Sequence, residues 1–300
     1  MESLACLDGE LLPADRARVP IMDRGFLFGD AVYEVMRIYR GRCWLEAEHM
    51  ARLRRSLAEM ELPAVDLEAL GERTRRTIEA SGVVEGTAYL HITRGVAPRS
   101  HAYPNPPVPP TELIVIRPYD DSGTALKRES GVAVVSRPDL RWKRCDVKST
   151  NLLANVVALE SANRAGAYEA VLVDADGMIT EATHSSVLWI REGRLCGTPN
   201  DEAILPGTTR FLAQRLAAGQ EIAFVEERIS LADLLKADEA MLVGTTIEVM
   251  PILAVDGHGI ACCQAGPITR KLQAAYRSAV EAWLAPRAVS MPGDRPRRTG

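Results

Sequence analysis

Among the residues that could carry covalent chemistry, Lys148 has the most informative surroundings. It lies in the string WKRCDVKSTNLLANVVAL, after a strand-like run and before an apolar helix. We expect a lysine at such an edge to be partly desolvated, which favours the neutral, nucleophilic amine. The chain has only five lysines, and arginine, which fills most basic positions, cannot act as an amine nucleophile. A solvated lysine at a helix start would give the same pattern, so other residues must decide.

A carboxylate stands at the end of another apolar strand, further along the chain. Glu181 occurs in GMITEATHSSVLWI, where its neighbours are apolar or threonine, so we expect it to point into a site. A buried carboxylate requires a cationic or protonated partner. One such partner is the protonated nitrogen of a pyridine ring, which an electron-sink cofactor requires. The alternative is an exposed glutamate at a strand end.

Two Gly-Thr-Thr strings could bind an anion. In the first, ILPGTTRFLAQRLA, Pro206 and Gly207 predict a turn, and Thr208 or Thr209 is a natural N-cap for the helix that follows. The free backbone N–H groups of a helix start attract phosphate. The second string, residues 244–246, follows an apolar strand. Most capped helices bind nothing, but two such strings offer a phosphate two independent sets of donors.

An arginine and a histidine stand two residues apart in TRGVAPRSHAYP. In an extended backbone, residues i and i+2 project to the same side, so Arg99 and His101 would face one ligand. The pair suits a carboxylate, which a guanidinium binds through two parallel hydrogen bonds. A solvated loop that carries both residues by chance is the alternative. Arg52, taken alone, is one of many arginines on a charged helix face.

The composition narrows the class of protein. Of the 300 residues, 47% are hydrophobic and 25% charged, the balance of an ordinary globular protein. A formal charge of −4 makes nucleic acid an unsuitable partner. The amino terminus lacks the apolar stretch of a secretory signal, and no run reaches the roughly 18 apolar residues of a membrane span. The six cysteines lack the spacing of a zinc site or a disulfide framework, so we expect no metal and a cytoplasmic location.

Hydrophobic periodicity and turn residues predict a mixed α and β chain in two parts. We expect a small N-terminal α+β domain over residues 1–118, a linker over 119–124 and a larger domain over 125–285. Residues 286–300 are rich in Pro and Arg, so we expect a disordered tail there. The predicted strands and hairpins cover residues 4–13, 31–48, 88–95, 112–119, 131–137, 169–182 and 186–195. The predicted helices cover residues 49–62, 65–82, 151–166, 208–218 and 267–285.

Five strings, taken together and in this order, are specific to one family: DRGFLFGDAVYEV, EHMARL, KSTNLLANVVALESANRAGAYEAVLV, DGMITEATHSS and ILPGTTR. From about residue 3 to about residue 280, the chain resembles the fold-type IV pyridoxal-phosphate transaminases. That family includes branched-chain aminotransferases, D-amino-acid aminotransferases and aminodeoxychorismate lyases. The string TRGVAPRSHAYP is most similar to the substrate-carboxylate loop of the D-amino-acid branch. The resemblance implies a two-domain α/β fold whose larger domain has a β-barrel-like core.

The resemblance also implies an activity and a role for each candidate residue. The activity is transamination between a D-amino acid, such as D-alanine, and a 2-oxo acid, such as 2-oxoglutarate or pyruvate, with pyridoxal 5′-phosphate as cofactor. Lys148 would form the Schiff base and carry the 1,3-proton shift, and Glu181 would pair with the pyridine nitrogen. The phosphate would be held by Arg52, Thr208, Thr209 and Thr245, and the substrate α-carboxylate by Tyr33, Arg99 and His101. A homodimer with each site at the interface is implied, so that Arg99 and His101 can serve the neighbouring chain's site.

Three places in the chain depart from the family's usual residues. Ser185 and Ser186 stand where Ser-Asn is frequent, and Phe26 stands where several relatives have tyrosine. His184 stands where smaller residues are usual; it either shapes the pocket or packs as a strand histidine. These departures spare the lysine, the carboxylate and the phosphate donors, so they bear on substrate preference rather than on reaction class.

Other functions remain open at this stage. Within the same fold, the chain could act on (R)-amines or branched-chain L-amino acids, or as a lyase on an aminated chorismate product. It could also be a non-catalytic binding protein that keeps the fold, although Lys148 and Glu181 together argue against this. A cysteine hydrolase built on Cys145, beside Arg144, lacks a histidine in a recognisable motif.

Overall fold

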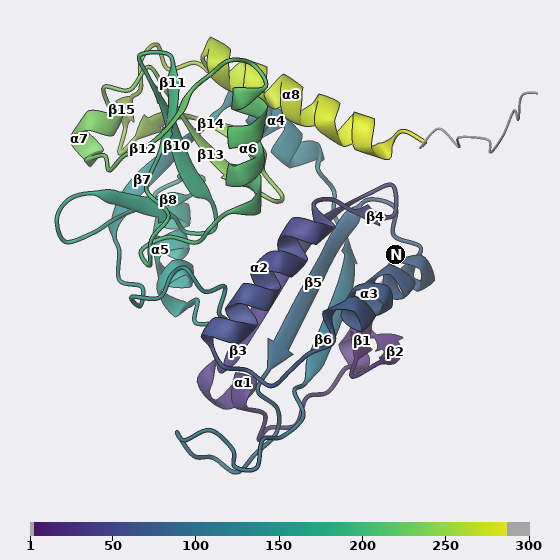
Figure 1. The fold of residues 1–300 in the computed structure, drawn as a ribbon. Helices are drawn as coiled ribbons and strands as arrows, with labels where there is room; N and C mark the ends of the chain where they lie inside the picture. Colours follow the sequence, from purple (N-terminus) through teal and green to yellow (C-terminus); the bar gives the residue numbers. More distant parts are fainter. Residues whose placement is uncertain (1–2, 287–300) are drawn as a thin grey trace, which may run out of the picture.

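The computed structural model describes residues 3–286, which fold into two parts, each built on its own sheet (Figure 1). One sheet has six strands and the other has nine. The mixed α and β architecture in two unequal parts is confirmed. Residues 286–300 were predicted to form a disordered tail, and all of them except residue 286 lie outside the described residues. Within residues 3–286, no helix combines the length and the apolar character needed to cross a membrane.

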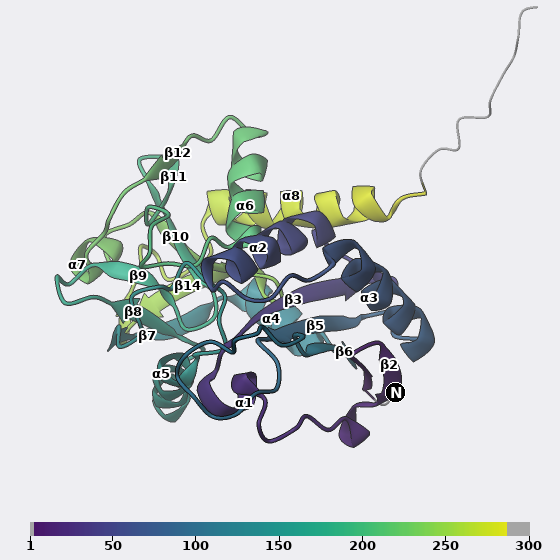
Figure 2. The ribbon, with the colours of Figure 1, turned by 60° about the horizontal axis from the view of Figure 1, so that its bottom comes forward.

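The N-terminal part is an antiparallel sheet with two long helices against one face (Figures 1 and 2). Its strand order is β2-β1-β6-β5-β3-β4. The strands are β1 (Leu4–Leu7), β2 (Glu10–Pro13), β3 (Ala31–Tyr39), β4 (Arg42–Cys43), β5 (Gly86–Thr93) and β6 (Glu112–Pro118). The helices are the short 3-10 helix η1 (Ala14–Arg16), α1 (Arg24–Phe28), α2 (Glu46–Glu59) and α3 (Leu67–Ser81).

Helices α2 and α3 form near the positions that the helical spacing of apolar residues predicts, although α2 begins at Glu46, within the range predicted as strand. Leu53 of α2, with Leu70 and Ile78 of α3, is buried in the core of this part. Burying these side chains against the sheet supplies most of the stability that such helices lack in isolation. Helix α3 ends at Gly82, whose φ of 65° is a left-handed conformation that glycine adopts without a steric penalty.

The C-terminal part is a mixed sheet that curls around its own core (Figure 2). The strand order is β12-β11-β10-β13-β14-β7-β8-β9, and β15 pairs with β14. The strands are β7 (Val132–Pro138), β8 (Ala170–Val173), β9 (Ile179–Ala182), β10 (Ser186–Arg191), β11 (Arg194–Gly197), β12 (Phe224–Glu226), β13 (Glu239–Gly244), β14 (Glu248–Val255) and β15 (His258–Gly259). The helices are α4 (Ser122–Ser130), α5 (Leu153–Arg164), α6 (Thr208–Ala218), α7 (Leu231–Leu234) and α8 (Pro267–Leu284).

Helix α4 begins inside the segment predicted as a linker, residues 119–124. It was missed because none of its residues is buried, so its sequence carries no apolar stripe for a periodicity analysis to detect. Helices α1 and α7 were missed because each spans only about one turn. The domain limits themselves stay a prediction.

One pairing between the two parts sets the position of the site. Strand β4 pairs only with the last residues of β3, so the first residues of β3 are left open on that side. Residues 148–150 fill this place: Tyr33 N–H donates to the Lys148 carbonyl at 3.0 Å, and Thr150 N–H donates to the Ala31 carbonyl at 3.1 Å. Ser149 forms a bridge with Val32. The lysine segment is therefore joined to the open edge of β3 by an isolated β-bridge.

A substitution at Gly86 tests how closely β5 packs against β6. A Cβ added there would collide with the Val83 side chain and with the Arg117 carbonyl oxygen, so the backbone would have to move. We expect Gly86→Ala to lower the free energy of unfolding by about 2 kcal/mol in urea denaturation. The control is Gly123→Ala in α4, where a Cβ meets open space, and which should be neutral or stabilising by up to about 1 kcal/mol. Equal losses in both variants would contradict this account.

Candidate active site

One cavity opens where the two parts meet, and seven of the nine candidate residues line it. Lys148 and Glu181, on whose proximity the sequence interpretation depends, face this same cavity. The seven lining residues are Tyr33, Arg52, Lys148, Glu181, Thr208, Thr209 and Thr245. The structure therefore brings the predicted nucleophile, carboxylate and phosphate donors to one place.

Lys148 is held at the cavity wall by its backbone. Its N–H donates to Ser56 Oγ of α2 at 3.2 Å, and its carbonyl accepts from Tyr33 on β3. The half-buried side chain places Nζ 4.4 Å from the centroid of the Tyr33 ring. The amine thus stands over an aromatic face, where it can reach a ligand in the cavity.

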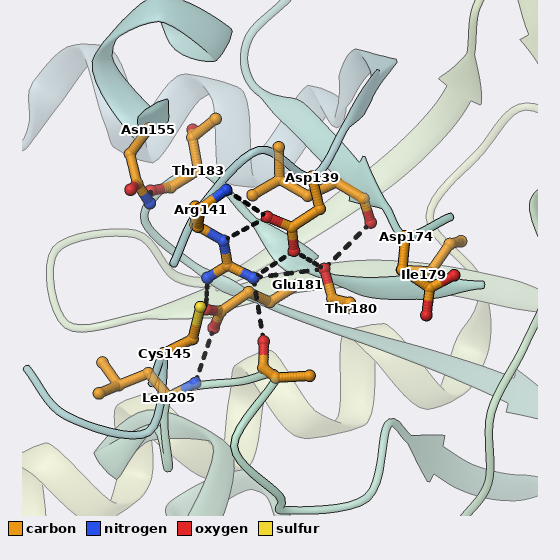
Figure 3. Close-up of polar contacts among 12 residues, drawn as sticks. Asp139, Arg141, Cys145, Asn155, Asp174, Ile179, Thr180, Glu181, Thr183 and Leu205 are labelled. Atoms are coloured by element: carbon orange, nitrogen blue, oxygen red, sulfur yellow. Dashed lines mark hydrogen bonds and ion pairs between the residues drawn. The ribbon is translucent and has the colours of Figure 1, made fainter. Parts of the chain in front are cut away.

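Glu181 is buried at the end of β9, and a guanidinium fixes its carboxylate (Figure 3). Arg141 donates to Glu181 Oε1, and the Leu205 N–H donates to Oε2 at 3.2 Å. Arg141 is itself held by Asp139, whose Oδ2 accepts from Nη2 at 2.6 Å. Burial raises the pKa of Glu181, and Arg141 with the Leu205 amide counters only part of that effect.

The sequence analysis missed Arg141. It did require a cationic or protonated partner for a buried Glu181, but it assigned that place to a pyridine ring. A cation beside one oxygen of Glu181 keeps the carboxylate oriented and leaves it able to accept a further hydrogen bond. Arg141 is therefore a positioning residue for Glu181.

Arg52 is buried and paired with a carboxylate from β3. Glu34, which is fully buried, accepts from Arg52 Nε at 2.7 Å and Nη2 at 2.8 Å, and also contacts His49 Nδ1 at 2.7 Å. Burial alone would raise the pKa of Glu34, but the Arg52 guanidinium outweighs it and holds that pKa well below its usual range. Arg52 Nη1 donates to the Pro206 carbonyl at 3.1 Å, directly before α6.

Glu34 and His49 were also missed by the sequence analysis. The available signal was a carboxylate inside an otherwise apolar strand, which needs a cation. His49 and Arg52 stand at i and i+3 of α2, so they share one helix face and reach the same carboxylate.

The start of α6 is arranged as an anion cradle. Gly207 is the N-cap, and no side chain caps the first turn, so its backbone N–H groups have no intrahelical partner. Thr208 and Thr209 are buried there and line the cavity. A Cβ on Gly207 would lie 2.8 Å from Ser186 Oγ, so this close approach requires glycine. With Arg52 beside it, the helix start offers a dianion both charge and directed donors.

Arg99 and His101 do not line the cavity of the described chain. They lie on the loop between β5 and β6, and both are exposed. The Arg99 guanidinium lies 5.3 Å from the centroid of the Phe28 ring, and the His101 ring centroid lies 5.6 Å from it. The two side chains thus meet on one aromatic ring, while their role in substrate binding stays a prediction.

Two further cavity residues bear on the alternatives. His184 is half-exposed and lines the cavity, so it does not pack in the core as a strand histidine would. Its Nδ1 lies 3.1 Å from Oε1 of the fully buried Glu169. Cys145 also lines the cavity, but burial raises the pKa of its thiol to about 12, and Sγ donates to the Trp142 carbonyl. A thiol in that state is not a nucleophile, which argues against a cysteine hydrolase.

The comparisons with known proteins agree with this geometry. The family model for amino-transferase class IV matches residues 31–255. The D-alanine aminotransferase of Staphylococcus epidermidis is 38% identical over 276 residues, covering 92% of this chain and 97% of that protein. The solved branched-chain amino acid aminotransferase of Escherichia coli has a TM-score of 0.86 at 24% identity, covering 93% and 94%. A PLP-bound hypothetical aminotransferase from Mycobacterium tuberculosis has a TM-score of 0.81 at 22% identity, covering 93% and 99%.

The chain therefore belongs to the class IV aminotransferases, and its fold is the fold-type IV architecture that the resemblance implied. Its cofactor is pyridoxal 5′-phosphate, as predicted. The cavity fits this molecule at three points. The cradle of Arg52 and α6 suits the phosphate, Glu181 suits the ring nitrogen, and the Lys148 amine suits the aldehyde.

The buried Glu34–Arg52 pair should make stability depend on pH. Because the pKa of Glu34 in the folded chain lies far below its usual 4.5, the pair stabilises the fold above about pH 4.5, and this contribution is lost as the pH falls further. We expect Glu34→Gln to lower the free energy of unfolding by about 3 kcal/mol at neutral pH, with a smaller deficit near pH 3. Denaturant unfolding across this pH range measures the difference.

The control is Glu160→Gln, which removes the exposed carboxylate partner of the exposed Arg164. An exposed pair of this kind contributes less than about 1 kcal/mol, so the control should stay near the wild type at every pH. A Glu34→Gln deficit that does not change with pH would rule out the ion pair as its source.

Proposed function

We propose that the chain catalyses transamination between a D-amino acid, such as D-alanine, and a 2-oxo acid, such as pyruvate or 2-oxoglutarate. The observation that carries the proposal is the single cavity lined by the Lys148 amine, the Glu181 carboxylate and the anion cradle of α6. The D-amino acid is supported by the 38% identity to a D-alanine aminotransferase. It is supported also by the Arg-x-His string at residues 99–101.

In this reaction the bound cofactor draws electrons away from the substrate Cα. Lys148 Nζ, at the cavity wall, acts as the base that accepts the Cα proton. Glu181, oriented by Arg141, accepts the hydrogen bond of a protonated ring nitrogen. Arg52 and the first turn of α6 bind the phosphate and so keep the reacting end within reach of the amine.

The working assembly that we propose is a homodimer in which Arg99 and His101 bind the substrate carboxylate in the partner's site, with Tyr33 beside them. Large apolar side chains on two elements support an interface, because monomers rarely expose so many together. Ile21 directly precedes α1, Phe26 lies in α1, and Leu153, Val156 and Val157 lie in α5; each is more than half exposed. The two elements are neighbours, since the Asn151 side chain donates to the Gly29 carbonyl.

The remaining partners are small molecules, and the proposed location is the cytoplasm. All six cysteines are free thiols, the state that a reducing compartment maintains. The substrates are amino acids and 2-oxo acids, as the class implies.

A donor panel tests the proposed substrate. We expect purified holoenzyme to convert D-alanine with 2-oxoglutarate at least about 100-fold more efficiently than L-leucine or an (R)-amine, because the Arg99/His101 pair recognises the α-carboxylate and so fixes which Cα face meets Lys148. Product formation by each donor is the measurement, and Lys148→Ala, which removes the amine, is the inactive control. Faster conversion of L-leucine or of the (R)-amine would show that a D-amino acid is not the preferred donor. Pyruvate release without an acceptor would indicate a lyase.

Arg99→Ala tests the carboxylate role. Loss of a charged hydrogen bond of about 1.5–3 kcal/mol should lower kcat/KM for D-alanine by roughly 10- to 100-fold, with the absorbance of the bound cofactor unchanged. Co-expression with Lys148→Ala then tests the shared site. If Arg99 serves the partner, a mixed dimer contains one intact site and regains activity; if it serves its own chain, no intact site forms. Unchanged D-alanine kinetics in Arg99→Ala would refute the carboxylate role.

A further inference from the structure

A buried arginine of α1 holds the loop that carries Arg99 and His101. Arg24 is 3% exposed, and its Nη1 donates to the Ser100 carbonyl at 2.6 Å and to the Ala102 carbonyl at 3.2 Å. These two carbonyls alternate with Arg99 and His101 along the loop. One guanidinium therefore binds the backbone carbonyls on both sides of His101. The carbonyl of Ser100 lies between His101 and Arg99.

The same loop is tied down through a second arginine and a shared carboxylate. Asp30, which is buried, accepts from Arg24 Nε at 2.8 Å and from Arg94 Nε at 2.7 Å through the same Oδ2. Arg94 also lies 3.5 Å from the ring centroid of Tyr103, two residues beyond His101. The two cations are thus neutralised in part, oriented, and unable to swing away from the loop.

The aromatic ring at the end of α1 meets both proposed ligand-binding side chains. Phe28 contacts the Arg99 guanidinium and the His101 ring, and the Arg24 guanidinium lies 4.9 Å from its centroid. A ring face attracts a cation by about 0.5–1 kcal/mol at an exposed site. Phe28 therefore restricts the rotamers of two side chains that would otherwise be free in solvent.

Helix α1 is in turn fixed to the lysine segment. The Gly29 carbonyl, directly after α1, accepts from Thr150 Oγ1 at 3.2 Å and from the Asn151 side chain at 3.3 Å. Residues 148–150 also pair with the open edge of β3. A short chain of contacts thus runs from the cofactor-binding segment through α1 to the loop.

We propose that Arg24 and Phe28 are positioning residues that hold Arg99 and His101 in the geometry needed to bind a substrate carboxylate, before substrate arrives. The inference rests on the proposed role of Arg99 and His101. Preorganisation of this kind lowers the entropy lost on binding, so it should act on KM for the amino donor. It should leave the cofactor and the proton transfer at Lys148 unaffected.

The test is steady-state kinetics of the holoenzyme with Arg24→Lys, Phe28→Leu and a matched control. Lysine keeps a cation beside Asp30 but loses the planar fork that bonds two carbonyls. We expect KM for D-alanine, or for the donor that the panel identifies, to rise about 10-fold in Arg24→Lys and about 3-fold in Phe28→Leu. The value of kcat should stay within about 3-fold, and the absorbance of the bound cofactor should not change.

The control is Arg37→Lys. Arg37 is also 3% exposed, lies in the same part of the molecule, and donates to two carbonyls, of Ile38 and Gly86, and to Glu85. It makes none of the loop contacts described above, so its replacement should change KM less than 2-fold. An equal rise in KM in this control would reduce Arg24 to a general structural role and overturn the proposal.

A double variant separates this inference from the proposed function. If Arg24 acts through Arg99 and His101, then Arg24→Lys should raise KM less than about 2-fold further in an Arg99→Ala/His101→Ala background, whereas independent effects would multiply. Independent multiplication overturns the positioning role, as does an unchanged KM in both Arg24→Lys and Phe28→Leu. An unchanged KM in Arg99→Ala alone would instead refute the carboxylate role. Should Arg24→Lys fail to fold, Phe28→Leu alone decides.

Discussion

The position of Lys148 depends on a backbone pairing between the two parts of the chain. Strand β4 is too short to cover β3, and residues 148–150 take the vacant edge through hydrogen bonds to Ala31 and Tyr33. The same segment then leads directly into α5 of the larger part. Because this pairing is made by the backbone, it fixes the main chain of Lys148 beside Tyr33, and the position of the amine depends on how the two parts pack. The packing of the two parts therefore also determines the geometry of the candidate site.

Around this lysine, two buried carboxylates are each matched by an arginine. Glu34 is paired with Arg52 and Glu181 with Arg141, and both arginines have further acceptors that fix their planes. A buried charge without a partner would destabilise the fold, so the pairs are required by the burial itself. Their second effect is to preset the dipoles that a charged ligand meets, which reduces the reorganisation needed when it binds. The requirements of folding and of cofactor binding are met by the same contacts.

The sequence predicted those features that local patterns determine. Apolar runs bounded by turn residues located α2, α3, α5, α6 and α8, and the turn at Gly207 located the anion cradle. It missed α4, which buries nothing, and it missed Glu34 and Arg141, because their partners are distant in the chain and only the fold brings them together. The spacing of Arg99 and His101 predicted a shared side, and Phe28 is where they meet. Which site they serve depends on an assembly that a single chain does not contain.

The attachment of the 95–110 loop has a consequence for how such enzymes diversify. Two of its anchors are the backbone carbonyl oxygens of Ser100 and Ala102, which do not depend on the side chains at these two positions. Substitutions at Ser100 and Ala102 can therefore accumulate with little loss of stability, whereas changes near Lys148 disturb the backbone bridge between the two parts. Under the roles proposed for Arg99 and His101, selectivity for a new acid can evolve in this exposed stretch while the segment that carries Lys148 is unchanged. In the proposed function, the reactive amine and the carboxylate contacts thus lie on two different segments of the chain.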